Sequence, residues 1–428
     1  MGELVIHGGR AIGGVHEVSG NKNAVLPMIA ATLLTSEPVT LQNVPEIADV
    51  AAMLEAAKTF GAKVERDFAA KTVTVRTERL RSARIPAVLA ARMRTSVLFA
   101  GPLLARAGRA SLPPPGGDAI GHRRLDTHFA GFRALGAKAT AGRKTLRFRG
   151  ELKGATILVD EASVTATENI LMASVTARGR TSIYNAACEP HIVDLANMLN
   201  AMGAKVSGAG TNLIVVEGVE RLSGCTARVG CDYIEAGSYI AAAAVTGGEL
   251  TLTNIDPEPF DVIEGAFKRF GVSWEISSRE RTLRFTPRKR LKMRYDLGDA
   301  IPSVSDGPWP AFPSDLMSIL IVLATQTRGT CLFFEKMFES RLYFVDSLKQ
   351  MGAKIVQCDP HRVVVTGPSP LYGGEFSSPD IRAGIALVIA ALAARGVSVI
   401  RNAEVIDRGY VAVERCLGAL GAGISRST

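Results

Sequence analysis

Hydrophobic residues recur along the chain with the period of an amphipathic helix, and each of these helices is followed by a glycine. In one copy Leu195, Met198, Leu199 and Met202 fall at i, i+3, i+4 and i+7, which places their side chains on one helix face. Gly203 then stands where a left-handed C-terminal cap is expected, and a strand and hairpin are predicted after it. The glycines of the six copies lie 67 to 81 residues apart: Gly61, Gly136, Gly203, Gly271, Gly352 and Gly421.

A second pattern, a nearly all-apolar helix, belongs to each copy. NAVLPMIAATLL, TENILMASVTA and RAGIALVIAALAA are examples, and each runs into a polar turn, a strand and a loop that usually opens with Asn. A helix that is apolar on all sides must be buried. The predicted unit is therefore a buried helix, a strand, a loop, a surface helix and a hairpin.

Six buried helices with their sheets exceed one hydrophobic core, and 428 residues favour two or three domains. The predicted fold class is α/β, with six repeated units, three in each of two domains. The predicted boundaries lie near residues 20 and 235, so that one domain covers 21–235.

Composition narrows the function classes. The chain is 47% hydrophobic and 21% charged, which is typical of a soluble globular protein, and its net charge of +9 indicates anionic partners. Basic runs with interleaved aromatics are absent, so nucleic acid is not an expected partner. The apolar run 383–394 is too short to span a bilayer, the N-terminus does not resemble a signal peptide, and the six cysteines lack metal-ligand spacing. These features predict a cytoplasmic protein without a metal or another cofactor.

Polar residues stand at the predicted starts of all six buried helices. Ser314, Thr167 and Asp380 can act as N-caps. Capping does not explain Lys22, Arg94 or Arg382, because a helix N-terminus disfavours positive charge. A bound anion would reverse that preference and is the favoured interpretation. The residues at these starts are Lys22, Asn23, Arg94, Thr95, Ser96, Thr167, Glu168, Asn169, Glu235, Ser314, Asp315, Asp380 and Arg382.

The loop SLPPPGGDAIGHRRLD, residues 111–126, occupies the connector of the second copy and is longer than its counterparts. It is either a solvated surface loop or a mobile lid that carries the acid Asp118 and the anion ligand Arg123. Arg341 and Arg408 stand in equivalent connectors. His128, close to the loop, fits a packing role as well as a catalytic one.

Asp315 follows the proline-rich turn PAFPS, which can cap a helix and still leave this carboxylate available as a base. Nucleotide-binding and hydrolase motifs are absent: no Walker A, GxGxxG, GxSxG or HExxH sequence occurs.

Six motifs together resemble one family: SGNKNAVLPMIAATLLTSEPVTLQNVP, GGDAIGHRRLD, NAACEPHIVDLANML, PAFPSDLM, FESR and IDRGY. They are similar to the UDP-N-acetylglucosamine 1-carboxyvinyltransferases, whose sister family with the same fold is 5-enolpyruvylshikimate-3-phosphate synthase. The resemblance extends over essentially the whole chain. It implies a two-domain inside-out α/β barrel in which residues 1–20 join 236–428.

The resemblance also implies an activity. The enolpyruvyl group of phosphoenolpyruvate would be transferred to the 3′-hydroxyl of UDP-N-acetylglucosamine with release of phosphate, the first committed step of peptidoglycan synthesis. The reaction would be an addition followed by an elimination, without metal or cofactor. A monomer or weak homo-oligomer that binds neither nucleic acid nor membrane is expected.

Individual roles follow from the matching motifs. Asp315 resembles the residue that takes the proton of the sugar hydroxyl, and Asp118 stands at the position of the loop acid. Lys22 resembles the lysine that contacts phosphoenolpyruvate and helps to trigger closure. The residues implied for phosphoenolpyruvate are Lys22, Arg94, Arg123 and Arg408. Those implied for the nucleotide sugar are Asn23, Ser163, Val164, Thr165, Asp315 and Met337. Those implied as supporting residues are Arg341, Asp380 and Arg382.

The chain departs from the usual family pattern in four places. Asp118 replaces a common Cys, Thr165 a Gly in the diphosphate turn, Trp309 a His, and Glu161 a basic residue. A different nucleotide, nucleotide sugar or shikimate 3-phosphate as acceptor, or a catalytically silent nucleotide-sugar-binding paralogue, are therefore alternatives. Because a carboxylate is a poorer nucleophile than a thiolate, resistance to the alkylating epoxide fosfomycin is expected.

Overall fold

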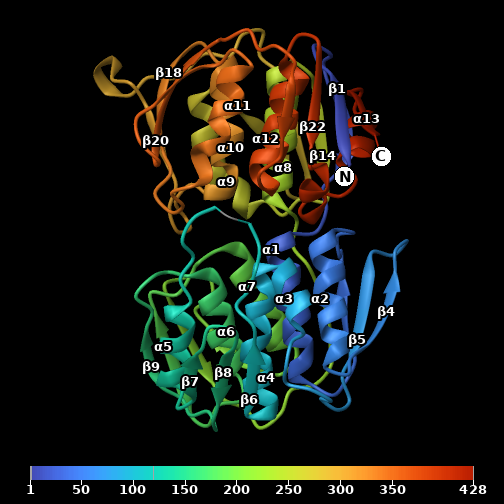
Figure 1. The fold of residues 1–428 in the computed structure, drawn as a ribbon, viewed down its shortest axis with the longest axis vertical. Coiled ribbons are helices and arrows are strands. Elements are labelled where there is room, and N and C mark those ends of the chain that lie inside the picture. Colours follow the sequence, from blue (N-terminus) through green and yellow to red (C-terminus); the bar gives the residue numbers. More distant parts are fainter. Residues whose placement is uncertain (1, 119, 428) are drawn as a thin grey trace. The chain divides into compact units, whose positions relative to one another are not determined.

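The structure, a computed structural model, describes residues 2–118 and 120–427, and its contacts divide them into two units (Figure 1). Residues 20–118 and 123–230 form the central unit. The described residues 2–19, 120–122 and 231–427 form the split unit, which takes segments from three parts of the chain.

The central unit contains three sheets and seven α-helices. Its sheets have the strand orders β13-β3-β5-β4, β6-β8-β7 and β11-β12-β10-β9. The strands are β3 (Val39–Gln42), β4 (Lys63–Asp67), β5 (Thr72–Arg76), β6 (Arg109–Leu112), β7 (Lys138–Ala141), β8 (Leu146–Arg149), β9 (Thr156–Leu158), β10 (Arg180–Tyr184), β11 (Lys205–Ser207), β12 (Leu213–Glu217) and β13 (Cys225–Arg228). The helices are α1 (Lys22–Ala31), α2 (Ala48–Thr59), α3 (Ala87–Arg92), α4 (Ala100–Ala107), α5 (Asp126–Ala134), α6 (Val164–Ser174) and α7 (Pro190–Ala201), with the 3₁₀ helices η1 (Thr32–Leu34) and η2 (Arg94–Phe99).

The split unit contains three four-stranded sheets and six α-helices. Its sheets have the strand orders β15-β16-β14-β2, β17-β18-β20-β19 and β21-β22-β1-β23. The strands are β1 (Glu3–His7), β2 (Gly14–Glu17), β14 (Leu250–Thr253), β15 (Trp274–Ser277), β16 (Thr282–Phe285), β17 (Ser303–Ser305), β18 (Gly329–Phe334), β19 (Lys354–Gln357), β20 (Arg362–Gly367), β21 (Glu375–Ser377), β22 (Val397–Arg401) and β23 (Gly423–Ser427). The helices are α8 (Tyr233–Thr246), α9 (Glu258–Arg269), α10 (Met317–Gln326), α11 (Val345–Gln350), α12 (Ile381–Ala393) and α13 (Val413–Ala419), with the 3₁₀ helices η3 (Leu297–Asp299), η4 (Ser314–Leu316), η5 (Arg341–Phe344) and η6 (Ala403–Arg408).

Buried apolar helices form the core of each unit, as the sequence predicts. In the split unit α8, α10 and α12 contact one another, and every residue of α10 from Met317 to Thr325 is buried. In the central unit α4 packs on α6, and α1 is buried from Ala24 to Ala31. Figure 1 shows the sheets around these helices, so the predicted α/β class with buried helices is confirmed.

Five of the six sheets place one strand between a parallel and an antiparallel neighbour, whereas both pairings in β6-β8-β7 are antiparallel. β14, for example, pairs in parallel with β2 and antiparallel with β16. In the sixth unit the second hairpin strand is absent, and β1 takes its place between β22 and β23. The N-terminal segment thereby completes two sheets of the split unit.

The glycine that follows each surface helix adopts the predicted left-handed conformation. All six marker glycines have positive φ, between 78° and 103°, a region that only glycine enters without steric cost. The sequence repeat therefore reflects one backbone turn that is used six times.

Two of the predicted helix starts are wrong. α6 begins at Val164, so that Thr167 lies in its second turn, where its Oγ1 accepts the N–H of Ala187 rather than capping the helix. α8 begins at Tyr233, and its cap is Asp232, not Glu235. Both errors arise because polar residues inside a helix were taken for its boundary.

Capping by Ser314 is also wrong, since its hydroxyl donates instead to Glu335 Oε1 at 2.8 Å. Asp380 does cap α12, as predicted, and accepts the N–H groups of Arg382 and Ala383. Asn21, which the sequence did not single out, caps α1.

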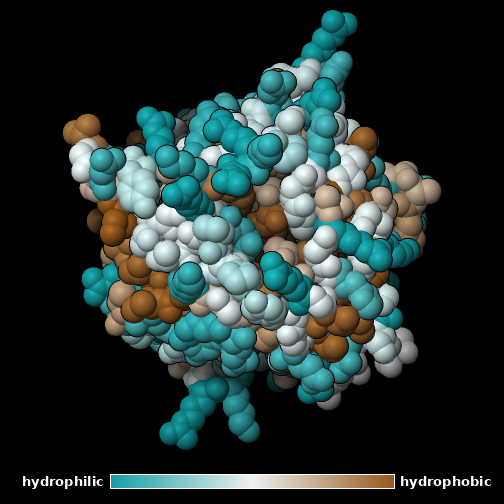
Figure 2. Space-filling view, turned by 90° about the horizontal axis from the view of Figure 1, so that it is seen from above, coloured by the Kyte–Doolittle hydropathy of each residue, from teal (hydrophilic) through white to brown (hydrophobic). Residues whose placement is uncertain are grey.

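The exposed large apolar side chains are scattered over the chain rather than collected in one segment. Figure 2 shows one face, on which hydrophobic patches are separated by long polar side chains. Within residues 2–118 and 120–427 no helix has both the length and the apolar character needed to cross a membrane.

Candidate active site

The start of α1 in the central unit holds an ion pair. Asn21 accepts the N–H groups of Asn23 and Ala24 at 2.8 and 3.1 Å, and this cap begins the helix at Lys22. Lys22 Nζ lies 3.0 Å from Asp49 Oδ2, and both side chains are largely buried. Asp49 therefore offsets part of the positive charge of Lys22 at this helix start, where the sequence predicts a bound anion.

Two arginines organise the base of loop 111–126. Arg94 Nη2 donates to the main-chain oxygens of Arg123 and Arg124 at 2.7 and 3.2 Å. Arg123 Nη2 in turn donates to the main-chain oxygen of Asp118 at 2.9 Å. Burial, and then the charge of Arg123, lower the pKa of Arg94 to about 10. Two cations held this close attract an anion between them.

The glycines of this loop permit close backbone approaches. Gly116 donates its N–H to Ala90 O at 3.0 Å, and a Cβ at this position would lie 1.9 Å from the oxygen of Ala91. Gly117 has φ of 103°. The half-buried Asp118 follows directly, so its position depends on two residues that lack a side chain.

The tip of the loop belongs to the split unit. There the N–H of His122 donates to Glu339 Oε1 at 2.9 Å, and the N–H of Ser340 donates to Ile120 O at 3.2 Å. The FESR motif that carries Glu339 and Ser340 thus holds the loop tip through one side chain and one main-chain bond.

The predicted diphosphate turn lies at the start of α6. Ser163 is the N-cap residue but makes no capping side-chain hydrogen bond, so N–H groups of Val164 and Thr165 in the first turn remain available to an anion. This feature distinguishes α6 from α1, α8 and α12, whose caps are filled by Asn21, Asp232 and Asp380.

His128 connects this turn to the core. Its Nδ1 accepts from Asn169 Nδ2 at 3.0 Å, which leaves Nε2 to donate to Thr165 Oγ1 at 3.1 Å. Asn169 also bonds the main chain at Val97 and Gly101. Burial, and then the charge of Arg94, lower the pKa of His128 to about 3, so the ring is neutral. His128 thereby fixes the side chain of the residue that replaces the usual glycine.

The split unit contains a second cluster around Asp315. Arg341 Nη2 donates to Asp315 Oδ1 at 2.6 Å, and Arg382 Nη2 donates to Asp315 Oδ2 at 2.9 Å. Burial lowers the pKa of each arginine, but Asp315 and the other acidic groups nearby together outweigh it and raise both pKa values above the ordinary value. A carboxylate oxygen can accept more than one hydrogen bond, so an ion pair with a guanidinium does not by itself prevent Asp315 from acting as a base.

Arg341 has unused hydrogen-bond donors. Its Nε and Nη1 are buried and have no hydrogen-bond partner among the residues that the structure describes. Its guanidinium lies 5.3 Å from the ring centroid of Phe338. Because a buried guanidinium N–H is costly to leave unpaired, this position suits a polar or anionic substrate group.

Tyr410 completes the cluster and was missed by sequence reasoning. Arg382 Nη1 donates to its hydroxyl at 3.3 Å, and the hydroxyl bonds Ser238 Oγ at 2.8 Å. Burial raises the pKa of Tyr410 to about 12, so the hydroxyl stays protonated. The available signal was its place in the IDRGY motif, two residues after Arg408, which is half-buried at the end of η6.

The sequence-predicted residues therefore fall into groups within each unit. Asp315, Arg341, Arg382 and the helix cap Asp380 lie together in the split unit. Met337 is partly exposed, and its main-chain N–H donates to Asp306 Oδ2 at 3.3 Å. In the central unit one group consists of Arg94, Arg123 and the main chain of Asp118, another of Lys22 with its neighbour Asn23, and a third of Ser163, Val164 and Thr165.

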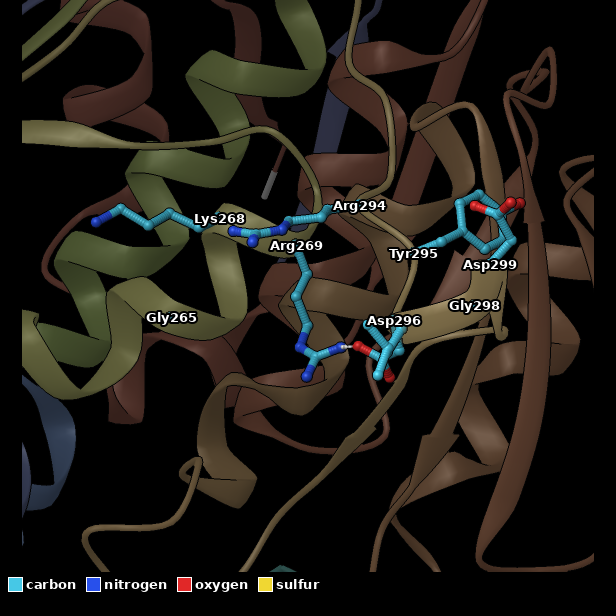
Figure 3. A pocket seen from close by; sticks show the side chains of 9 residues that line it. Gly265, Lys268, Arg269, Arg294, Tyr295, Asp296, Gly298 and Asp299 are labelled. Atoms are coloured by element: carbon cyan, nitrogen blue, oxygen red, sulfur yellow. Dashed lines mark hydrogen bonds and ion pairs between the residues drawn. The ribbon is translucent and has the colours of Figure 1, made fainter.

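A pocket of about 710 Å³ lies elsewhere in the split unit. It is formed by the end of α9 and residues 294–299, and the ion pair of Arg269 with Asp296, 2.6 Å long, spans part of it (Figure 3). None of the residues that the sequence predicted for the site lines it. Within the described part of the chain no cluster of His, Cys, Asp and Glu could hold a metal ion.

Comparison with known proteins agrees with this fold. The chain belongs to the family of EPSP synthase (3-phosphoshikimate 1-carboxyvinyltransferase), whose family model matches residues 6–417. Two relatives are each named UDP-N-acetylglucosamine 1-carboxyvinyltransferase. The one from Treponema denticola is 49% identical, with 99% of each chain covered, and the one from Treponema pallidum is 51% identical, with 98% of each covered.

Solved structures share the fold. The enolpyruvyl transferase NikO from Streptomyces tendae superposes with a TM-score of 0.88 at 24% identity and covers 100% of this chain and 99% of its own. EPSP synthase from Acinetobacter baumannii gives a TM-score of 0.76 at 21% identity, with 100% of both chains covered. The predicted inside-out α/β architecture and family membership are therefore confirmed.

Proposed function

We propose that this protein transfers the enolpyruvyl group of phosphoenolpyruvate to the 3′-hydroxyl of UDP-N-acetylglucosamine and releases phosphate. The observation that carries this proposal is an identity of about one half with enzymes of that name over nearly the full chain. The reaction is the first committed step of peptidoglycan synthesis, so the protein contributes to cell-wall synthesis and cell shape in the cytoplasm.

Basic side chains bind phosphoenolpyruvate. Lys22, Arg94, Arg123 and Arg408 bind its phosphate and carboxylate groups. The mutual proximity of Arg94 and Arg123, together with the lowered pKa of Arg94, supports this role because an anion relieves their repulsion.

The nucleotide sugar binds at α6 and at the Asp315 cluster. The uncapped N–H groups at Val164 and Thr165 donate to the diphosphate, and Asn23 and Met337 orient the sugar. The unpartnered donors of Arg341, beside Asp315, support a polar substrate group there. The reaction needs only the two small-molecule substrates as partners. A monomer or weak homo-oligomer carries it out.

The chemistry needs one base and one acid. Asp315 accepts the proton of the 3′-hydroxyl while the hydroxyl oxygen attacks C2 of phosphoenolpyruvate, and Asp118 gives a proton to C3. The resulting tetrahedral ketal then loses phosphate and one methyl proton, which restores the double bond. Fixed guanidinium groups stabilise the charge that builds on phosphate.

A panel of acceptors tests the proposal. Phosphate release is measured with phosphoenolpyruvate and, in turn, UDP-N-acetylglucosamine, another UDP-sugar, UMP and shikimate 3-phosphate. Release that depends on UDP-N-acetylglucosamine supports the proposal. Release with one of the other acceptors alone assigns a different substrate, and release with none of them indicates a silent paralogue.

Asp118 gives a second, independent test. Because alkylation by fosfomycin requires a strong nucleophile, turnover of the unaltered protein stays insensitive to this epoxide, while Asp118→Cys becomes sensitive. Asp118→Ala removes the acid and reduces turnover by about 10² to 10⁴. Rapid covalent modification of the unaltered protein, or full turnover by Asp118→Ala, contradicts the proposed role.

A further inference from the structure

Four of the repeated units end their middle strand in the same way, which we call the asparagine clamp. An Asn directly after the strand adopts φ of 57° to 60°. Its side-chain amide donates to the main-chain oxygen of the residue that follows the neighbouring parallel strand. The four bonds, 2.8 to 2.9 Å long, run from Asn43 to Val229, Asn185 to Val159, Asn254 to Val18 and Asn402 to Ser378. A neutral amide therefore ties each strand end to its parallel partner.

Backbone hydrogen bonds identify the equivalent residues of the fifth unit. In the clamp, the residue that accepts the amide also donates its own N–H to the last residue of the Asn strand, at 2.9 to 3.1 Å. Asp306 donates its N–H in the same way to Phe334 O, at 3.3 Å. Phe334 is the last residue of β18, so Glu335 occupies the place of the Asn and Asp306 the place of its partner.

Glu335 lies in an environment that disfavours charge. Its side chain is fully buried, and Oε1 accepts from Ser314 Oγ at 2.8 Å. Oε2 meets no donor within residues 2–118 and 120–427, but the side chain of Asp306 lies within hydrogen-bonding reach of the Glu335 carboxyl. Burial first, and then the neighbouring carboxyl of Asp306, raise the pKa of Glu335 to about 9, although Arg341 and Ser314 act in the opposite direction. The imidazole of His361 faces the main chain of Glu335, with Nδ1 2.6 Å from its oxygen.

Asp306 uses its carboxylate to hold the connector. Its two oxygens accept the main-chain N–H groups of Lys336 and Met337, the second at 3.3 Å. The carboxylate is itself buried, at 2% exposure. It therefore fixes the peptide that leads from Glu335 to Met337, the residue assigned to the nucleotide sugar.

We propose that Glu335 is a protonated carboxylic acid that donates its hydrogen to Asp306, and that this pair positions the Met337 backbone for the nucleotide sugar. A carboxylic acid offers one O–H donor and one carbonyl acceptor, as an Asn side chain offers a donor and an acceptor. The pair of Glu335 and Asp306 thus takes the place of the asparagine clamp in the fifth unit. Oε2 of Glu335 carries the proton, because Oε1 already accepts a hydrogen bond from Ser314. The proposal rests on the proposed function only where it names the nucleotide sugar.

Protonation couples this pair to pH. The folded state holds the Glu335 proton more tightly than the unfolded chain, whose carboxyl has its ordinary value of 4.5. The stability contributed by the proton is therefore complete below about pH 4.5 and is lost as pH rises towards 9. Above that value two adjacent carboxylates repel each other and the connector loses its support.

The test compares Glu335→Gln with the unaltered protein and with Glu220→Gln, which removes an exposed carboxylate. The melting temperature is measured from pH 6 to 10 without substrate. One titrating group changes it by roughly 3 to 5 °C per pH unit in a domain of this size. Glu335→Gln is expected to lose that part of the slope and to remain folded, whereas Glu220→Gln keeps the slope of the unaltered protein.

Kinetics give the second readout. Asp306→Asn is expected to raise the KM for UDP-N-acetylglucosamine about tenfold while leaving the KM for phosphoenolpyruvate nearly unchanged. Glu335→Gln keeps both values at pH 7. An unchanged pH slope in Glu335→Gln, or failure of this variant to fold, overturns the protonated state. Equal KM changes for both substrates in Asp306→Asn overturn the positioning role. An unaltered protein without activity would refute the proposed function, while the melting series still decides on the proton.

Discussion

At the scale of single residues, Asp315 is one carboxylate between two buried guanidinium groups, and it is the proposed catalytic base. Arg341 and Arg382 bind its two oxygens, and Tyr410 holds Arg382 from the other side. Removing Asp315 leaves the buried guanidinium groups of Arg341 and Arg382 without their shared carboxylate partner. This arrangement fixes the orientation of the proposed base before substrate binds.

Asp315→Ala is expected to lower the free energy of unfolding by roughly 3 to 5 kcal/mol, because two buried cations lose their partner. It also abolishes phosphate release. Denaturant unfolding and the phosphate assay measure the two effects. Asp346→Ala on α11, which removes an exposed ion pair with Lys349, serves as the control and costs about 1 kcal/mol or less. Unchanged stability in Asp315→Ala would refute the ion-pair geometry.

His128 makes stability depend on acid pH. Its folded pKa of about 3 lies below its ordinary value of 6.5, so the unfolded chain binds a proton that the folded protein excludes. This stability is present above pH 6.5 and is lost as pH falls towards 3, by roughly 2 kcal/mol between pH 7.5 and 5. Unfolding free energies of His128→Gln are expected to show a flatter acid limb. Parallel curves for both proteins would mean that His128 is charged in the fold.

At the scale of elements, one turn closes every surface helix, and at Gly203 its glycine is needed for conformation rather than space. Gly203 has φ of 97°, and no atom lies within 4 Å of the place that a Cβ would take, whereas Gly116 is packed against the oxygen of Ala91. Alanine substitutions at these two glycines therefore distinguish the cost of backbone strain from the cost of a steric clash.

Gly203→Ala is expected to cost about 1 to 2 kcal/mol of stability through strain alone, with turnover retained. Gly116→Ala must move the loop that carries Asp118, because its Cβ would lie 1.9 Å from a carbonyl oxygen. It is expected to reduce turnover much more than Gly203→Ala. Thermal unfolding and the phosphate assay on both variants decide this. A fully active Gly116→Ala enzyme would show that the loop base is not constrained.

Elements were predictable where one physical rule dominates. Apolar periodicity marked the buried helices, and glycine marked the turns, because burial and left-handed backbone leave a direct record in the sequence. Helix starts were less predictable, since Thr167 and Ser314 have the composition of caps but bond Ala187 N and Glu335 instead. Such choices depend on tertiary neighbours that no local pattern contains.

At the scale of the whole molecule, each unit has its own buried helices and three sheets. Leu199 of α7 and Leu320 of α10 are fully buried in the central and the split unit, respectively. Separate cores of this size can unfold as separate cooperative transitions.

Calorimetry is expected to resolve two unfolding transitions. A core substitution in each unit then shows which transition belongs to that unit. Leu199→Ala should lower the transition of the central unit and Leu320→Ala that of the split unit, each by roughly 5 to 15 °C for a loss of 2 to 5 kcal/mol. A single two-state transition that both variants lower equally would show that the units unfold together.

Motifs in the sequence predicted the charged residues of the candidate site that lie within those motifs. Asp315, Arg341 and Arg382 were named from sequence and lie in contact. Asp49, Tyr410 and Glu335 were not named, because each acts through a partner that is distant in the chain. Their roles follow from burial and hydrogen bonding, which only the folded chain displays.

The covalent product formed from phosphoenolpyruvate and UDP-N-acetylglucosamine identifies the reaction most directly. Purified protein is incubated with phosphoenolpyruvate and UDP-N-acetylglucosamine, and the nucleotide product is analysed by mass spectrometry together with free phosphate. We expect a 3′-enolpyruvyl ether whose mass equals that of the two substrates less phosphoric acid, with one phosphate released for each ether formed. Unchanged UDP-N-acetylglucosamine, or phosphate released without the ether, would contradict it.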